Sequence, residues 1–287
     1  MRLCAFLSTD NLEDFFVYDD LVKPHLQKLG WQVEDVFWRN KTVDYNQFDL
    51  VVVRSTWDYQ QDSAAFLECL ERIDDSTANL QNPLSLMRWN LSKAYLHALA
   101  SAGVPVLPTI WAEGYSEAQI LESFDQLNTP EIVIKPLISA NADFTYRLSK
   151  KRFMEENPNL SEIFRVRPFM IQSFEPSIAE KGEYSLFYFA GQYSHAILKR
   201  PKAGDFRVQE EHGGQLEAIT PTSDMLKLGA LTLEALPTKT LYARVDMLET
   251  QRGLEIIEVE LIEPSLYFNM DKNSALRFAH AINDFPL

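Results

Sequence analysis

Short apolar runs alternate with helical repeats of apolar residues over the first 88 residues of the chain. Strands are predicted at Leu3–Leu7 and Asp49–Arg54, and amphipathic helices at Asp19–Leu29 and Asp62–Ile73. This alternation is typical of an α/β layer built on a mostly parallel sheet. Ligands of such sheets bind beyond the carboxyl ends of the strands. We therefore expect substrate contacts from the end of the second strand and the residues after it: Arg54, Ser55, Thr56, Trp57 and Asp58.

A second region begins at Pro83, and its pattern becomes richer in strands toward the carboxyl end. Asn90–Lys93 is expected to open a helix that ends at Gly103, and Ser116 with Gln119 forms a capping box for the next helix. Further elements are predicted as strands at Glu131–Lys135, Phe169–Phe174, Tyr184–Ala190, Tyr193–Lys199, Leu241–Leu248 and Leu254–Ile262, with a helix at Asp224–Leu236. We expect an α/β domain over residues 1–88, followed by two α+β parts over 89–174 and 175–287.

Composition narrows the class of protein. Of 287 residues, 46% are hydrophobic and 24% charged, which is typical of a soluble globular protein. The net charge of −14 argues against nucleic acid as a partner. The two cysteines, Cys4 and Cys69, provide no disulfide framework, and no apolar run approaches the roughly 18 residues of a membrane span. We expect a cytoplasmic protein without a membrane partner, and a homodimer as the commonest kind of soluble assembly.

Carboxylates recur on the polar side of the last two predicted strands. In Leu241–Leu248 apolar residues alternate with polar ones, so one face is expected to be buried and the other polar. If Thr250–Gly253 forms a hairpin, Asp246 on that polar face lies close to Glu258 and Glu260. Clustered carboxylates repel one another unless a hard cation such as Mg²⁺ lies between them. The alternative is a solvated acidic face of the sheet.

Phosphate binding needs another explanation than a glycine-rich motif, since neither GxxxxGK[ST] nor GxGxxG is present. Lys93 lies at the start of a predicted helix and Lys135 at the end of an apolar strand, where a buried stem can deliver a positive charge to phosphates. The segment Ile138–Thr145 offers backbone amides and hydroxyls, and Phe169–Phe174 offers an apolar strand with polar groups at its end. Surface lysines, an ordinary loop and core packing are the structural alternatives.

Taken in order, these pieces resemble the ATP-grasp superfamily over roughly residues 85–270. The motifs that carry the resemblance are Asn90-x-x-Lys93, Ile-Lys135-Pro, the Ser139-Ala-Asn loop, Met-Ile-Gln172, Gly182-Glu-Tyr-Ser185, Ile-Leu-Lys199-Arg, Arg244-Val-Asp246 and Ile-Glu258-Val-Glu260. The Arg54–Tyr59 and Arg88-Trp-Asn90 stretches are similar to the branch that contains glutathione synthetase-like and D-cycloserine synthetase-like ligases. The resemblance implies a fold in which ATP binds between two antiparallel-sheet subdomains that follow an α/β leading domain.

The resemblance also implies a role for each site residue. ATP phosphates would be bound by Lys93, Lys135 and the loop at Ser139. Adenine would contact Gln172, Ser173 and Phe174, and Glu183 would approach the nucleotide. Asp246, Glu258 and Glu260 would hold two Mg²⁺ ions. The place of phosphoryl transfer would be lined by Lys199, Arg200, Arg207 and Arg244, of which Lys199, Arg200 and Arg244 would be catalytic.

The expected activity is ATP-dependent ligation of a carboxylate to an amine through an acyl phosphate, with an amino acid or small peptide as substrate. Two residue patterns depart from the family. Glu260 stands where Asn is common, and Ser139–Thr145 contains no glycine although the phosphate-covering loop is usually glycine-rich. A phosphotransferase, a cyclising ligase and an ATP-binding regulatory protein without turnover are the alternatives.

Overall fold

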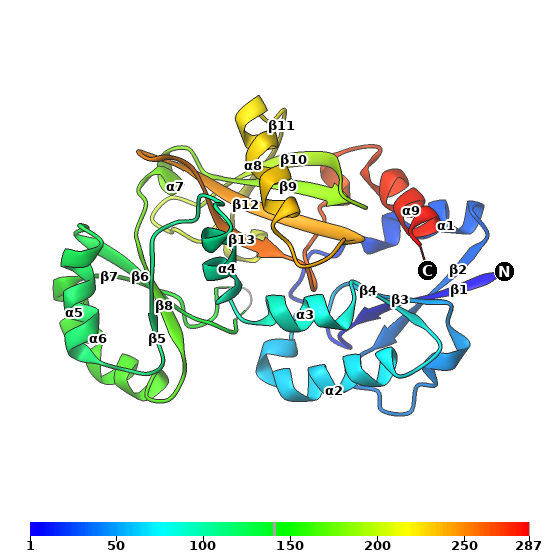
Figure 1. Cartoon of the computed structure of the whole chain (residues 1–287), viewed down its shortest axis with the longest axis horizontal. Coiled ribbons are helices and arrows are strands. Elements are labelled where there is room, and N and C mark those ends of the chain that lie inside the picture. Colours follow the sequence, from blue (N-terminus) through cyan, green and yellow to red (C-terminus); the bar gives the residue numbers. More distant parts are fainter. Residues whose placement is uncertain (140–141, 287) are drawn as a thin grey trace.

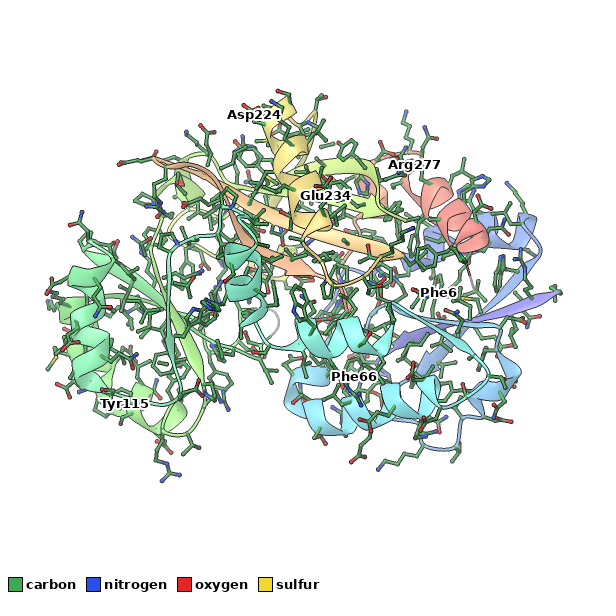
Figure 2. The ribbon with its side chains drawn as sticks, viewed as in Figure 1. Phe6, Phe66, Tyr115, Asp224, Glu234 and Arg277 are labelled. Atoms are coloured by element: carbon green, nitrogen blue, oxygen red, sulfur yellow. The ribbon has the colours of Figure 1, made fainter. Side chains whose placement is uncertain are left out.

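The leading domain is a parallel sheet covered on both faces. In this computed structural model, which describes residues 1–139 and 142–286, the sheet has the order β2-β1-β3-β4. All its strand pairs are parallel, as predicted. The strands are β1 (Arg2–Ser8), β2 (Trp31–Phe37), β3 (Leu50–Val53) and β4 (Asn79–Gln81), and the helices are α1 (Lys23–Lys28) and α2 (Ser63–Asp74). Phe6 lies in the core on one face and Phe66 in the core on the other (Figure 2).

A second sheet stands apart from the leading domain at the far end of the molecule (Figure 1). It has the antiparallel order β5-β8-β6-β7. Its strands are β5 (Thr109–Ala112), β6 (Glu131–Pro136), β7 (Tyr146–Ser149) and β8 (Phe169–Ser173), and its helices are α5 (Glu117–Gln126) and α6 (Lys150–Ile163). Ser116 caps α5 as predicted, since its side chain accepts a hydrogen bond from the Gln119 amide.

Two short helices connect the leading domain to this sheet. The predicted helix start at Asn90 is wrong, whereas the predicted end of a helix before Gly103 is confirmed. The chain forms α3 (Leu84–Leu91) and α4 (Tyr95–Ser101), separated by Ser92, whose ψ of 129° is extended. Asn90 lies in the last turn of α3. Its amide donates to the Val259 carbonyl at 2.8 Å and accepts from the Leu261 amide at 3.0 Å. These two bonds tie the end of α3 to a strand of the third sheet, and helical hydrogen bonding stops there.

The third sheet is central and fully antiparallel, with the order β11-β10-β9-β12-β13. Its strands are β9 (Glu183–Phe189), β10 (Gln192–Arg200), β11 (Gln215–Ile219), β12 (Tyr242–Thr250) and β13 (Gly253–Glu260), and the helices in this part are α7 (Ser177–Glu180), α8 (Ser223–Glu234) and α9 (Ser274–Asp284). Each of the three sheets lies within one of the three predicted ranges. Short 3-10 helices occur at Asp19–Leu21, Tyr45–Gln47, Tyr59–Gln61, Glu210–His212 and Phe268–Met270.

Strand β12 does not have the single buried face that its alternating sequence predicts. Every residue from Tyr242 to Met247 is buried. Val245 packs in a core with α4 and α8, while Tyr242 packs against Phe278 of α9 on the other side. The polar face of β12 is therefore an interior surface, and its charged side chains are removed from bulk water.

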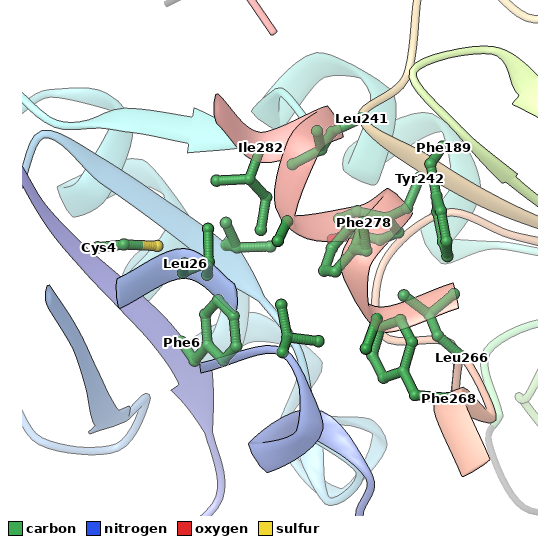
Figure 3. Packing of buried hydrophobic residues seen from close by; sticks show 14 of the residues in the cluster. Cys4, Phe6, Leu26, Phe189, Leu241, Tyr242, Leu266, Phe268, Phe278 and Ile282 are labelled. Carbon is green, nitrogen blue, oxygen red and sulfur yellow. The ribbon is translucent and has the colours of Figure 1, made fainter. Parts of the chain in front are cut away.

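One hydrophobic core joins the leading domain to the central sheet. Phe6 of β1 and Leu26 of α1 belong to the same cluster as Phe189 of β9 and Phe278 of α9 (Figure 3). Helix α9 thus returns from the end of the chain to pack beside α1 (Figure 1). Among the described residues, no helix combines the length and the apolarity that crossing a membrane requires.

The titration of His195 depends on its burial in this joint core. Its ring stacks on Phe187 with centroids 4.2 Å apart, and its Nε2 lies 3.1 Å from the Leu266 carbonyl. Burial lowers the pKa of His195 from 6.5 to about 4, and the charge of Arg277 adds to that effect while Asp271 opposes it. The unfolded chain therefore takes up a proton below pH 6.5 that the folded protein does not take up until about pH 4.

We expect His195→Gln to remove this part of the acid sensitivity. The wild type should lose roughly 3 kcal/mol of stability relative to the variant as the pH falls from 6.5 to 4, since each pKa unit corresponds to about 1.4 kcal/mol. Denaturant unfolding at a series of pH values measures the difference. His97→Gln, at an exposed position of α4, is the control and should run parallel to the wild type. Parallel curves for His195→Gln as well would contradict the buried neutral ring.

Candidate active site

One cavity lies where the second sheet, the central sheet and the leading domain meet. It receives side chains from β6, β8, β9, β10, β12 and β13, and from the segment after β3. Thirteen of the sequence-predicted site residues line it: Trp57, Lys93, Lys135, Ser139, Gln172, Ser173, Phe174, Glu183, Lys199, Arg207, Arg244, Glu258 and Glu260. Residues far apart in the sequence are therefore brought to one place, as their order in the chain predicted.

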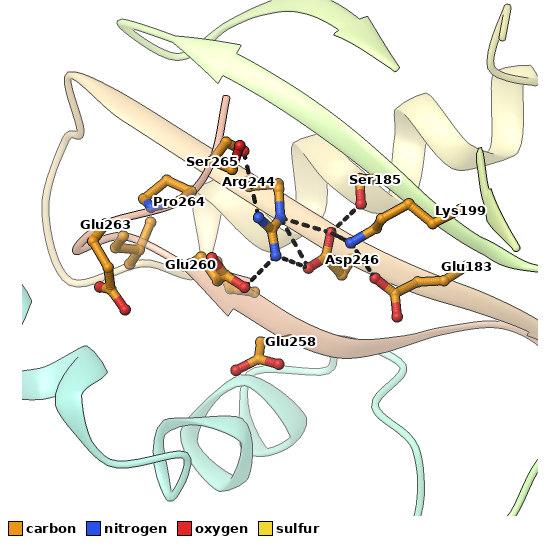
Figure 4. A network of polar contacts seen from close by, with 12 residues as sticks. Glu183, Ser185, Lys199, Arg244, Asp246, Glu258, Glu260, Glu263, Pro264 and Ser265 are labelled. Atoms are coloured by element: carbon orange, nitrogen blue, oxygen red, sulfur yellow. Dashed lines mark hydrogen bonds and ion pairs between the residues drawn. The ribbon is translucent and has the colours of Figure 1, made fainter. Parts of the chain in front are cut away.

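The β12–β13 hairpin supplies the charged floor of the cavity. Thr250 pairs with Gly253, and a shift of register between Asp246 and Met247 then pairs Asp246 with Glu258 and Arg244 with Glu260. The predicted closeness of Asp246 to Glu258 is confirmed, although it depends on this irregularity. Arg244 donates to Asp246 at 2.9 Å and to Glu260, as Figure 4 shows. Only 2% of the Asp246 side chain is exposed, against 28% for Glu258 and 27% for Glu260. Glu258 and Glu260 thus face the cavity, whereas Asp246 lies beneath it.

Burial and neighbouring charges set the ionisation of these carboxyls in opposite directions. Burial, with the nearby carboxylates of Glu258 and Asp246, raises the pKa of Glu260 to about 7, although Arg244 opposes the change. Burial acts the same way on Asp246, but Arg244 and Lys199 outweigh it and hold the pKa of Asp246 below its usual value. Asp246 is therefore a permanent anion that fixes Arg244, while Glu260 is the carboxyl most open to a new cationic partner.

The carboxylates of Asp246, Glu258 and Glu260 are the predicted ligands for Mg²⁺. Within the described residues, no three metal-binding side chains converge on a common point, because each carboxylate already holds a cation. Mg²⁺ is commonly bound by one or two carboxylates together with water and phosphate oxygens. Glu258 and Glu260 fit that requirement from the cavity floor. Asp246 is committed to Arg244, Lys199 and Ser185, so it reaches an ion only if one of these contacts opens.

The two predicted phosphate lysines approach the cavity from different elements. Lys93 lies between α3 and α4, and its ammonium contacts Glu258 at 2.7 Å and the Ser139 carbonyl at 3.0 Å. Lys135 comes from β6 and has no ion-pair partner among the described residues. Burial, together with the charge of Lys93, lowers the pKa of Lys135. An anion bound beside Lys135 would relieve this unfavourable burial of an unpaired charge.

The glycine-free segment adopts glycine-like backbone angles. Ala140 and Asn141, which belong to the predicted phosphate-covering loop, lie outside the described residues. On their carboxyl side, Ala142 and Phe144 have φ of 58° and 50°, values that L-residues rarely adopt. These two residues therefore hold backbone angles that favour glycine, at a cost in strain.

Glu183 and Lys199 form a buried pair on adjacent strands. Their side chains meet at 2.5 Å, and Lys199 also lies 3.7 Å from Asp246. Burial raises the pKa of Glu183, and Lys199 opposes that rise. Gly182 permits the approach of the two strands, because its φ is +92° and a Cβ there would lie 2.6 Å from the Lys199 carbonyl oxygen.

The predicted adenine side is built from the end of β8. Gln172 donates to Thr109 at 2.9 Å and Ser173 donates to Glu175 at 2.8 Å. The Arg147 guanidinium lies 3.6 Å from the centroid of the Phe174 ring. Arg207, on the opposite wall, pairs with Asp205 at 2.8 Å. This corner combines an aromatic face with polar edges, which suits a planar base.

Six predicted site residues do not line the cavity, and one of them is Asp246, which lies beneath the floor. Arg200 is half-exposed and pairs with Glu217, because neighbouring residues of a strand face opposite ways and Lys199 takes the inner side. Of the five predicted residues in the leading domain, only Trp57 lines the cavity. The other four are structural: Arg54 and Ser55 bind Asp19, Thr56 is buried, and Asp58 binds Trp38 and Arg39.

Several cavity residues escape the sequence prediction, among them Tyr59, Glu263 and Tyr267. Tyr59 ends the Arg54–Tyr59 stretch that carries part of the resemblance, whereas Tyr267 carries no recognisable pattern. Glu263 does, since it is the third carboxylate in Glu258-Val-Glu260-Leu-Ile-Glu263 and comes directly before Pro264, where the strand has ended. Two residues of the leading domain bind the backbone here. Trp57 donates to the Glu263 carbonyl at 2.8 Å, and Arg54 donates to the Pro264 carbonyl at 2.9 Å.

Comparison with known proteins agrees with this arrangement. A family model described as the N-terminal domain of D-cycloserine synthetase DcsG matches residues 4–82. The cycloserine biosynthesis protein DcsG from Streptomyces lavendulae is 30% identical over 269 residues, which cover 88% of this chain and 89% of that protein.

Solved structures extend the likeness to the whole fold. The crystal structure of D-cycloserine synthetase DcsG superposes with a TM-score of 0.86 at 28% identity, covering 98% of this chain and 99% of that one. The ATP-grasp ligase PsnB, solved with a minimal precursor, Mg and ADP, has a TM-score of 0.67 at 13% identity and covers 98% and 96%. The second likeness concerns the fold alone.

We expect Arg54→Met to destabilise the protein instead of weakening a substrate contact. The change leaves Asp19 buried without its cation and frees the Pro264 carbonyl, so the free energy of unfolding should fall by about 3–5 kcal/mol. Chemical denaturation measures it. Arg88→Met, which breaks the half-exposed pair with Glu71, is the control and should cost less than about 1 kcal/mol. Unchanged stability in Arg54→Met would return Arg54 to the candidates for substrate binding.

Proposed function

The chain belongs to the DcsG family and is an ATP-dependent ligase of the ATP-grasp class that forms carbon–nitrogen bonds, and we propose that its substrate is a small amino acid derivative activated at a carboxylate. The observation that carries this proposal is the cavity floor. Arg244, Asp246, Glu258 and Glu260 form one register-paired cluster opposite Lys93 and Lys135. Such a surface suits a phosphate chain and the charge that develops during phosphoryl transfer.

We place the nucleotide between the second and the central sheet. The base would lie against Gln172, Ser173 and Phe174, and the phosphates would extend toward Lys93, Lys135 and Ser139. Glu183 is near enough to the same path to contact the nucleotide. Support comes from Lys135, which is partly buried and whose ammonium has no ion-pair partner among the described residues.

Glu258 and Glu260 would hold magnesium, with Asp246 as a third ligand if Arg244 gives up one of its contacts. We propose that two Mg²⁺ ions bind and that the protein forms a homodimer. When bound, magnesium neutralises charge on the phosphoryl oxygens. Each carboxylate that turns to a metal releases the cation it now holds, so Lys93 and Arg244 become available to phosphate oxygens.

The reaction follows from these positions in two steps. A substrate carboxylate oxygen attacks the γ-phosphorus of ATP, the bond from that phosphorus to the bridging oxygen breaks, and ADP leaves with the electron pair. Arg244 and Lys199 hold the developing negative charge. A neutral amine nitrogen then attacks the acyl phosphate carbon, gives up a proton, and displaces phosphate. Arg207 is partly exposed at the cavity wall, where it would bind the phosphate that leaves.

A ring-closing reaction is the second candidate, because the relatives are named for cycloserine, a cyclic amide. In that case the attacking nitrogen belongs to the activated molecule. The wall formed by Trp57, Tyr59 and Tyr267 closes the substrate end of the cavity with bulky side chains, which favours a compact molecule.

Glu258→Gln should abolish magnesium-dependent ATP binding while leaving the fold intact, because it removes a ligand charge and little volume. Calorimetric titration with a non-hydrolysable ATP analogue, with and without Mg²⁺, measures this. Glu217→Gln, a change on β11 outside the cavity, is the control and should bind like the wild type. Equal magnesium dependence in Glu258→Gln and in the wild type would refute the metal role.

Product analysis tests the reaction class. We expect ADP release only when a carboxylate-bearing amino acid derivative is present, and mass spectrometry should show a product one water lighter than the joined substrates. A ring-closing reaction gives a product with no second molecule incorporated. A phosphorylated substrate that accumulates instead would show a phosphotransferase.

A further inference from the structure

The cavity contains a carboxyl group that the proposed reaction leaves unused. Of the glutamates deep in the cavity, Glu183 pairs with Lys199, Glu258 with Lys93, and Glu260 with Arg244. Glu263 lines the same cavity, yet no cation of the described residues lies within ion-pairing distance of it. Figure 4 shows its carboxyl apart from the Arg244 network, and no ion pair reaches it. A carboxylate in such a place is expensive to ionise unless a cation arrives.

The backbone that carries Glu263 is held at three successive carbonyls. Trp57 donates to Glu263 at 2.8 Å, Arg54 to Pro264 at 2.9 Å, and Arg244 to Ser265 at 3.4 Å. Two of these donors come from the leading domain and the third is the residue placed at phosphoryl transfer. The position of Glu263 is therefore fixed relative to Arg244, as a binding group must be to select a substrate.

The surroundings of Glu263 suit an ammonium group. The Tyr59 hydroxyl lies beside its carboxyl and interacts with it. Trp57 and Tyr267 line the same part of the cavity, and aromatic faces attract cations. Burial, helped by the charge of Glu260, raises the pKa of Glu263 to about 8, which is the behaviour of a carboxyl without a counter-ion. A bound ammonium would supply the missing charge.

We propose that Glu263, positioned by Tyr59, is the subsite for a primary ammonium group of the substrate. This rests on the proposed function, in which Arg244 faces the carboxylate being activated. An ammonium ion has no lone pair and does not attack an acyl phosphate. The nitrogen held at Glu263 is therefore not the nucleophile, and the substrate is an amino acid derivative that presents a second, uncharged nitrogen to the activated carbon.

The experiment uses two ring compounds that differ at one group. D-cycloserine carries a primary amine, and isoxazolidin-3-one is the same ring without it. Each is titrated calorimetrically into the full-length protein with ADP and Mg²⁺ present. The wild type should bind D-cycloserine at least about 10-fold more tightly, since a hydrogen bond to a charged group contributes about 1.5–3 kcal/mol.

In Glu263→Gln that preference should disappear, with D-cycloserine binding weakened about 10-fold or more and isoxazolidin-3-one binding unchanged. Tyr59→Phe keeps the carboxylate and should lose part of the preference. Glu211→Gln removes an exposed charge from the same cavity and should keep the preference within about 2-fold. An equal loss in Glu211→Gln would point to the general negative potential of the cavity and overturn the subsite.

The outcomes separate this inference from the proposed function. If the wild type binds both rings equally, or Glu263→Gln keeps the preference, the ammonium subsite is wrong and the ligase proposal stands. If the wild type binds neither ring while it still binds ATP with magnesium, the proposed substrate class fails and the subsite fails with it. Glu263→Gln keeps the size of the side chain, and its ADP affinity in the same titrations shows whether the site is intact.

Discussion

The buried guanidinium of Arg244 is the interaction on which the rest of the site depends. It contacts Asp246 and Glu260 and donates to the Ser265 carbonyl, so it joins β12, β13 and the segment after β13. Arginine suits this place because its planar fork bonds several acceptors at once and remains charged when buried. Without it, Asp246, Glu260 and a free carbonyl would face one another without a cation, and the hairpin would lose its register-paired floor.

The leading domain is a structural part of the site, although it supplies few of its lining residues. Arg54 crosses from the end of β3 to the Pro264 carbonyl, and the core that joins Phe6 to Phe278 holds the two parts together. The rule that ligands bind beyond the carboxyl ends of parallel strands placed this segment correctly. The rule did not distinguish side chains that face a substrate from side chains that hold the cavity wall in place.

How much the sequence predicts depends on the range of the interactions. The alternation along β12 and β13 predicted the polar face, but the turn register alone would pair Asp246 with Ile257. A shift of register between Asp246 and Met247 places Glu258 opposite Asp246. The break at Ser92 was not predictable, since it arises from bonds between Asn90 and a strand about 170 positions away. Arg200 is a different case. Residue periodicity already put it on the face opposite Lys199, and only the resemblance to the family kept both residues in one site.

The ion pairs of the cavity are better explained by chemistry than by stability. Taking two charges out of water costs several kcal/mol per ion, and apolar residues of similar volume often stabilise a protein as well or better. Yet Lys93, Lys199 and Arg244 are each held by a glutamate or aspartate in the interior. Such pairs keep cations and carboxylates in fixed positions while the site is empty, so little reorganisation is needed when phosphates and metal exchange places with them. Glu263 takes no part in this exchange because it holds no cation. In the proposed site Glu263 recognises the substrate, whereas the paired residues act in the reaction.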